Sequence, residues 1–70
     1  MTQAERILRH LQDYHTITPQ EAFIDYGIMR LGARIWELRH QGYNITAQLV
    51  AGKNRYGEPT RWAEYRLEER

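Results

Sequence analysis

The chain has 70 residues, a formal net charge of +1 and no cysteine. A chain of this length forms a single domain, expected over residues 1–70, and has room for only a small core. The missing cysteine excludes disulfides and thiolate metal sites, and no apolar run approaches the roughly 20 residues of a membrane span. Serine is absent as well, so nucleophilic catalysis by serine or cysteine is excluded.

Positive charge is concentrated in the middle of the chain. Residues 28–42 contain three arginines and one glutamate, and residues 43–63 contain one lysine, two arginines and one glutamate, so each segment sums to +2. Residues 1–27 sum to −2 and residues 64–70 to −1. Nine of the ten basic residues are arginine, whose planar guanidinium suits bidentate contact with phosphate.

The first helix is predicted from a capping signal and a helical apolar pattern. Thr2 followed by Glu5 is a capping box, in which each side chain bonds the backbone of the other residue. Apolar residues then recur every three to four positions, which predicts a helix over residues 3–14. Residues 15–17 form a short extended link whose Ile17 is expected to point inward.

The second helix begins with three signals that agree. Thr18 is a favourable N-cap, Pro19 fits the first helical position and Glu21 completes a second capping box. The helix is expected to run through Tyr26 and to end at Gly27, because glycine readily adopts the left-handed conformation that terminates helices.

A third helix is expected from about Ile28 to Gln41, and with the second helix it forms a helix-turn-helix unit. Gly42 ends it. At about 100° per residue, one side of this helix forms a buried apolar stripe made of Ile28, Leu31, Ile35 and Leu38. The opposite side carries Met29, Ala33, Trp36 and His40, with Arg30 and Glu37 along one edge.

Beyond Gly42 the apolar residues alternate, which predicts two strands joined by a loop over residues 51–59. A slip of one residue in the second strand exchanges Trp62 for Tyr65 in the core, and the sequence leaves this register open. In the expected β-hairpin the inner face consists of Ile45, Leu49, Ala63, Tyr65 and Leu67.

The order of elements is helix, short extended segment, helix, turn, helix and hairpin. This order predicts an α+β fold of the winged helix-turn-helix class, with a three-helix core and a two-stranded β-hairpin wing. Because an isolated hairpin is at best marginally stable in water, packing on the helices is expected to hold the wing in place.

Three residues of the third helix have two interpretations each. Gly32 lowers helix stability by about 1 kcal/mol relative to alanine, so it either lets the exposed side approach a nucleic-acid backbone or admits a neighbouring element. Trp36 either contacts DNA or packs under the wing beside Tyr43, and the second is favoured because tryptophan is mostly buried. Arg34 either pairs with Glu37, three residues on, or also reaches phosphate.

The run IWELRHQGYNI, residues 35–45, resembles the end of the recognition helix and the start of the wing in winged helix-turn-helix repressors of the biotin-repressor type. The longer run ITPQEAFIDYGIMRLGARIWELRHQGYNI, followed by NRYGEPTRWAEYRL, resembles the small helix-turn-helix proteins of bacteriophages and prophages. The resemblance extends from Ile7 to Leu67. The chain departs from that group at Gly32, where alanine is common.

This resemblance implies a domain that binds double-stranded DNA, with the third helix in the major groove and the wing against the backbone. Transcriptional regulation in a phage or prophage is the implied role, and the cytoplasm of a bacterial host, at the nucleoid when bound, is the expected location. The residues placed at the DNA by position are Met29, Arg30, Ala33, Arg34 and Trp36 of the third helix and Lys53, Arg55 and Arg61 of the wing.

Three alternative functions fit the same residues. Two are DNA-binding roles, an excisionase-like architectural factor and a component of a DNA-packaging complex. The third is a protein–protein interaction module that would use Met29, Trp36 and Tyr56. An enzyme is not expected, because the three histidines lack the spacing of a metal site, and neither are a cofactor, a metal, a small-molecule ligand or a membrane partner. Since one such module has a modest footprint on DNA, a homodimer or a cooperative oligomer on DNA is expected.

Overall fold

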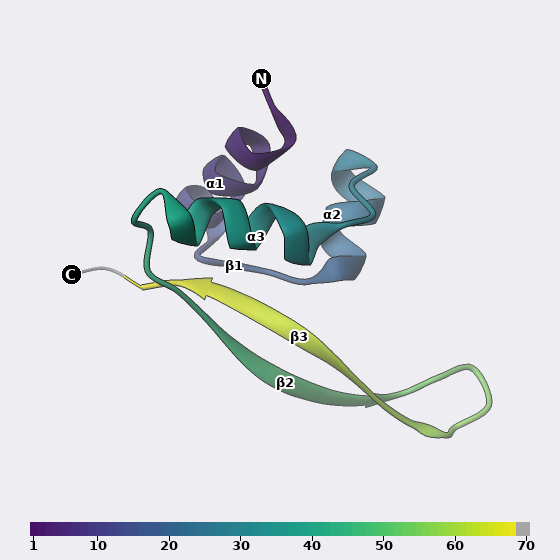
Figure 1. Cartoon of the computed structure of the whole chain (residues 1–70). Coiled ribbons are helices and arrows are strands. Elements are labelled where there is room, and N and C mark those ends of the chain that lie inside the picture. Colours follow the sequence, from purple (N-terminus) through teal and green to yellow (C-terminus); the bar gives the residue numbers. More distant parts are fainter. Residues whose placement is uncertain (69–70) are drawn as a thin grey trace.

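The computed structural model describes residues 1–68 and contains three helices and a three-stranded antiparallel sheet. Figure 1 shows the helices grouped over one end of the sheet, while the hairpin of the two long strands extends well beyond them. This arrangement confirms the predicted winged helix-turn-helix fold. The elements are α1 (Gln3–Tyr14), β1 (Thr16–Ile17), α2 (Pro19–Tyr26), α3 (Leu31–His40), β2 (Ile45–Lys53) and β3 (Pro59–Leu67).

Both predicted capping boxes are formed. At α1 the Glu5 N–H donates to Thr2 Oγ1 at 3.1 Å, and the Thr2 N–H donates to Glu5 Oε1 at 2.9 Å. Thr18 and Glu21 make the same pair of bonds at the start of α2, at 3.2 and 2.9 Å. These bonds satisfy N–H groups that have no partner inside their helices, which explains why both starts were readable from the sequence.

The turn between α2 and α3 is longer than predicted, because α3 begins at Leu31 rather than Ile28. Gly27 is left-handed at φ 68°, and the Ile28 N–H donates back to Ala22 O at 3.0 Å, which belongs to the end of α2. Arg30 has φ −115° and ψ 58°, which is not helical. Met29 and Arg30 therefore lie in the turn and at the N-cap, not on the first turn of the helix.

The core lies where the three helices meet one end of the sheet. The predicted stripe of α3 is buried, and the inward direction expected for Ile17 is confirmed. His10 was not expected there, but it is 5% exposed, and its Nδ1 lies 2.6 Å from the hydroxyl of Tyr26, which ties α1 to α2. The buried apolar residues are Ala4, Ile7, Leu11, Ile17, Ala22, Ile28, Leu31, Ile35, Leu38 and Ile45.

The sheet has the order β1-β3-β2, so the predicted extended link is a short third strand. Thr16 lies opposite Arg66 and Ile17 opposite Tyr65. β1 thus pairs with the base of the wing and fastens it to the helices. No helix within the described residues is long and apolar enough to cross a membrane.

β2 and β3 pair without interruption from Ile45 opposite Leu67 to Lys53 opposite Pro59. The connecting loop is therefore only residues 54–58, shorter than the predicted 51–59. This register also decides between the two aromatic residues, because Tyr65 is packed against the core and Trp62 lies on the other face of the sheet.

The predicted inner face of the hairpin is correct at its base and wrong at Leu49. Ile45 is buried, and Ala63, Tyr65 and Leu67 are half-buried, but Leu49 is 70% exposed. The reason is the direction of the wing, whose two strands run away from the helices toward the tip (Figure 1).

Candidate nucleic-acid interface

The solvent-facing side of α3 is a strip that consists of Gly32, Trp36, Arg39 and His40. Trp36 is 60% exposed, so the favoured interpretation, in which it packs under the wing, is wrong. Ile35 and Leu38 of α3 face the core instead, and Tyr65 of β3 packs against the core. An exposed tryptophan on this side of α3 leaves a large aromatic surface available for a partner.

Trp36 and His40 form a stacked pair on this strip. Their ring centroids are 3.7 Å apart and the ring planes are inclined by 27°. His40 Nδ1 lies 2.9 Å from the backbone oxygen of Trp36, and because a carbonyl only accepts, Nδ1 is the donor. Nε2 is then free to bond an outside group. The sequence placed His40 on the exposed side, but the stack depends on side-chain conformations that it does not reveal.

Gly32 faces the base of the wing. A Cβ atom at this position would lie 3.8 Å from the Tyr65 hydroxyl, which is an ordinary van der Waals distance. The neighbouring element expected in one interpretation of Gly32 is therefore the wing. The packing nevertheless leaves room for a methyl group, so the close approach does not require glycine.

Two arginines of α3 have partners within the domain. Arg39 Nε donates to Ile45 O at 2.8 Å, and its guanidinium carbon lies 6.0 Å from the centre of the Tyr65 ring, so Arg39 links α3 to the wing. Arg34 Nη1 donates to Glu37 Oε1 at 2.8 Å, which confirms that pair, and the Arg34 Nε is buried without a hydrogen-bond partner among residues 1–68. Arg34 remains a predicted DNA contact, although part of its guanidinium is already engaged.

The other predicted contacts at the start of α3 differ in exposure. Met29 is 81% exposed, and Arg30 is exposed beside it at the N-cap. Ala33 is half-buried, so it offers less surface than its predicted position opposite the stripe suggested. The turn before α3 is therefore more accessible than the first turn of the helix itself.

The tip of the wing is held by one asparagine. Asn54 Oδ1 accepts from the backbone N–H groups of Tyr56 at 2.9 Å and Glu58 at 3.1 Å, and Gly57 adopts φ 77°. These bonds fix the loop, so Arg55 and the 80% exposed Tyr56 project from an ordered turn.

Four basic side chains have no ion pair, hydrogen bond or aromatic contact among residues 1–68: Arg30, Lys53, Arg55 and Arg61. All four were predicted DNA contacts, and we call them the free cations. They lie in the turn before α3 and in the outer half of the wing. Figure 1 shows that the start of α3 and the tip of the hairpin point toward the same end of the molecule.

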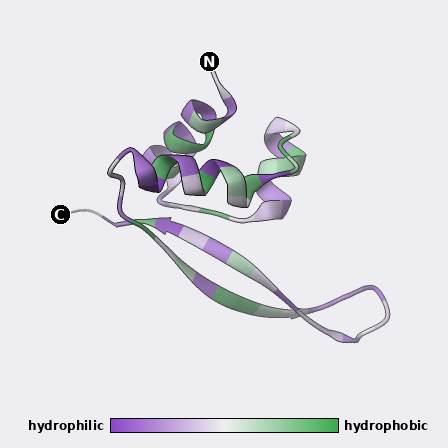
Figure 2. Cartoon of the chain, in the orientation of Figure 1, coloured by the Kyte–Doolittle hydropathy of each residue, from purple (hydrophilic) through white to green (hydrophobic). Residues whose placement is uncertain are grey.

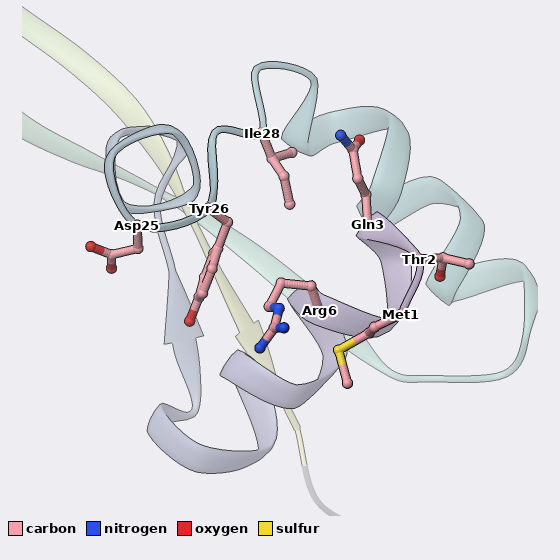
Figure 3. A pocket seen from close by; sticks show the side chains of 7 residues that line it. All are labelled: Met1, Thr2, Gln3, Arg6, Asp25, Tyr26 and Ile28. Atoms are coloured by element: carbon pink, nitrogen blue, oxygen red, sulfur yellow. The ribbon is translucent and has the colours of Figure 1, made fainter.

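A pocket of about 500 Å³ lies elsewhere, between the start of α1 and the end of α2. Figure 3 shows the side chains of Arg6 and Tyr26 next to each other in this pocket, with the guanidinium carbon 5.7 Å from the ring centre. Burial raises the pKa of the Tyr26 hydroxyl. None of the free cations lines this pocket, and residues 1–68 contain no group of three histidine, aspartate or glutamate residues arranged to hold a metal.

Comparison with known families gives one match. A family model described as a winged helix-turn-helix domain matches residues 2–70. The matched segment includes all three helices and both long strands of the wing. No curated protein and no solved structure matches the chain.

Proposed function

Because the chain belongs to the winged helix-turn-helix family, we propose that it binds double-stranded DNA through α3 and the wing. Domains of this family typically bind DNA and are not enzymes. The observation that supports this proposal most is the position of the free cations, since basic side chains without internal partners are available to phosphate. We further propose a role as a transcriptional regulator of the phage or prophage type, in the cytoplasm of a bacterial host.

In this proposal α3 enters the major groove, which is wide enough to admit an α-helix. The Trp36–His40 stack then faces base edges, where the free His40 Nε2 and the indole N–H can form hydrogen bonds. Arg30 reaches phosphates at the start of α3. Lys53, Arg55 and Arg61 reach phosphates along the wing, which positions the domain but carries no base information.

Equilibrium binding to a short labelled duplex at low salt tests the proposal. Wild-type protein should bind, and Arg30→Ala and Arg55→Ala should each weaken binding by roughly fivefold, or about 1 kcal/mol. Arg9→Ala is the matched control, because it removes the same charge from α1, where Arg9 pairs with Asp13 at 3.2 Å. Absence of binding by the wild-type protein at low salt would rule out the proposal.

The role within DNA binding is tested by selecting bound sequences from a random duplex pool. A palindromic consensus supports a regulator that binds as a symmetric pair. Direct repeats support the alternative, an excisionase-like architectural factor that binds as a cooperative array.

A protein–protein interaction module is the second candidate, because three large apolar side chains near the free cations are exposed: Met29, Trp36 and Tyr56. Exposed aromatic residues and methionine are enriched at protein interfaces. If Trp36→Ala changes the oligomeric mass and leaves DNA affinity unaltered, this function is favoured over base contact by Trp36.

A further inference from the structure

The two long strands of the wing differ in what covers their outer edges. β3 lies in the middle of the sheet, although β1 pairs only with its Tyr65 and Arg66. β2 is an edge strand over its whole length, Ile45–Lys53, and has no neighbour on its outer side among the described residues. A row of backbone N–H and C=O groups on β2 therefore has no strand beside it, and at its start the Ile45 carbonyl accepts from Arg39 Nε at 2.8 Å.

The hydrogen bonds at the two ends of the hairpin show which residues of β2 face outward. The Glu68 N–H donates to Asn44 O at 2.8 Å, and the Asn54 N–H donates to Glu58 O at 3.0 Å. Bonded and non-bonded pairs alternate in an antiparallel ladder, so the even-numbered residues of β2 bond to β3. The outward-facing backbone groups belong to Ile45, Ala47, Leu49, Ala51 and Lys53.

The outer edge of β2 lacks the features that normally prevent strand pairing. It has no proline, no charge from Ile45 to Gly52 and, since the register is unbroken, no bulge. The uncovered outer edge of β3 is different, because it includes Pro59, which has no N–H, and the charged Arg61. Charge and proline are the usual protection of edge strands, so one edge of the same hairpin is protected and the other is open.

Hydrophobic side chains accompany this open backbone. Figure 2 shows mainly hydrophobic residues along the middle of β2. Leu49, at the centre of the strand, is 70% exposed. A partner that pairs with the edge would therefore gain apolar contact at its midpoint in addition to backbone hydrogen bonds.

We propose that this partner is a second copy of the chain, with the two β2 strands pairing antiparallel about a two-fold axis at Leu49. In this register Ile45 lies opposite the partner's Lys53, and Ala47 lies opposite the partner's Ala51. The outward N–H and C=O groups from Ala47 to Ala51 then have bonding partners, and the sheets of both copies join into one. The two Leu49 side chains become neighbours.

The outward-facing residues Ala47, Leu49 and Ala51 read the same in both directions, so a second copy places alanine opposite alanine and leucine opposite leucine. This stretch carries no charge, so no like charges meet at the centre of the interface. A two-fold axis perpendicular to the sheet also keeps both helix layers on the same side. Both copies of α3 then face the same direction. The inference goes beyond the proposed function and does not depend on it.

Association is measured without DNA, so its outcome is separate from that of the DNA-binding experiment. Sedimentation velocity over about a hundredfold range of concentration should show a shift from monomer to dimer by mass action. In the same range, amide hydrogen exchange should slow at Ala47, Leu49 and Ala51. The amides of Gln48 and Val50 should be protected at every concentration, because they bond within the hairpin.

Two variants with a matched control locate the interface. Leu49→Lys places two positive charges opposite each other at the axis. Because like charges directly opposite each other in an interface are destabilising, this variant should associate at least about tenfold more weakly than wild type. Leu49→Pro removes the outward N–H and should have a similar effect, with protection at Gln48 and Val50 showing that the wing is folded. Leu49→Ile keeps the N–H, the apolar side chain and the strand preference and should associate nearly as wild type does.

Either of two results overturns the proposal. One is a wild-type protein that stays monomeric at the highest concentration. The other is a dimer that Leu49→Lys leaves unchanged, which would place the interface away from β2. If Leu49→Pro unfolds the wing, the association of Leu49→Lys alone decides whether β2 forms the interface.

Discussion

At the scale of single residues, the two arginines of α3 and the arginine at its N-cap have different roles. Arg39 is bonded to the carbonyl of Ile45, and Arg34 is paired with Glu37, whereas Arg30 has no partner among residues 1–68. The pair of Arg34 was predictable because it is three residues along one helix. The partner of Arg39 was not, because it depends on how the wing folds back on α3.

Removing Arg39 should therefore affect stability more than removing Arg30. Arg39→Ala leaves the Ile45 carbonyl without its 2.8 Å bond and separates α3 from the wing, so we expect a loss of about 1 kcal/mol in the free energy of unfolding. Urea denaturation measures it, with Arg30→Ala as the control that should lie within about 0.5 kcal/mol of wild type. Equal stability of Arg39→Ala and Arg30→Ala would contradict this role.

Gly32→Ala should raise stability by up to about 1 kcal/mol, because alanine favours the helix and the added methyl meets Tyr65 at an ordinary distance. Thermal unfolding gives the comparison. Gly27→Ala is the contrasting change and should lower the Tm, because Gly27 has φ 68°. A lower Tm for Gly32→Ala would mean that packing at the wing does require glycine.

At the scale of elements, features that depend on residues close in the sequence were predicted correctly, whereas features that depend on contacts between elements were not. The caps of α1 and α2 involve residues three apart, so their sequence predicts both starts. The start of α3 has no side-chain cap that the sequence could reveal. Ile28 is buried together with the stripe of α3, and its apolar side chain at helical spacing led to the prediction that the helix begins there. The strands of the wing were predicted too short, because Gly52 was assigned to the loop as a turn-forming residue. In the structure Gly52 lies within β2, and the ring of Trp62 occupies the space that a side chain at position 52 would need.

The capping box of α1 predicts a dependence of stability on pH. The backbone and side-chain hydrogen bonds of Thr2 lower the pKa of Glu5 from its ordinary value of 4.5. The folded state then binds fewer protons than the unfolded state, so the stabilisation is present above pH 4.5 and is lost as the pH falls through the lowered pKa.

Glu5→Gln isolates this contribution. The variant should have a lower Tm than wild type at pH 7, because the amide is a weaker acceptor for the Thr2 N–H. The difference should shrink as the pH falls below 4.5. A difference in Tm that stays constant from neutral to acidic pH would contradict the assignment to the Glu5 carboxylate.

At the scale of the whole molecule, the fold was predictable and the exposed surface was predictable only in part. Element order and the stripe of α3 were sufficient for the winged helix-turn-helix class. The free cations were all among the predicted contacts, because lysine and arginine side chains are seldom fully buried. Trp36 and Leu49 were assigned to buried positions on their residue type or alternation, and their exposure follows from the length and direction of the wing.

The proposed DNA binding depends on contacts between the free cations and the phosphates of duplex DNA. The salt dependence of duplex affinity tests it most directly, since log Kobs falls linearly with log salt concentration by about 0.9 for each phosphate neutralised. We predict a clear negative slope for the wild-type protein, a slope shallower by about 0.9 for Arg55→Ala and an unchanged slope for Arg9→Ala. A slope near zero, or the same slope in Arg55→Ala as in wild type, would show that the free cations do not contact phosphates.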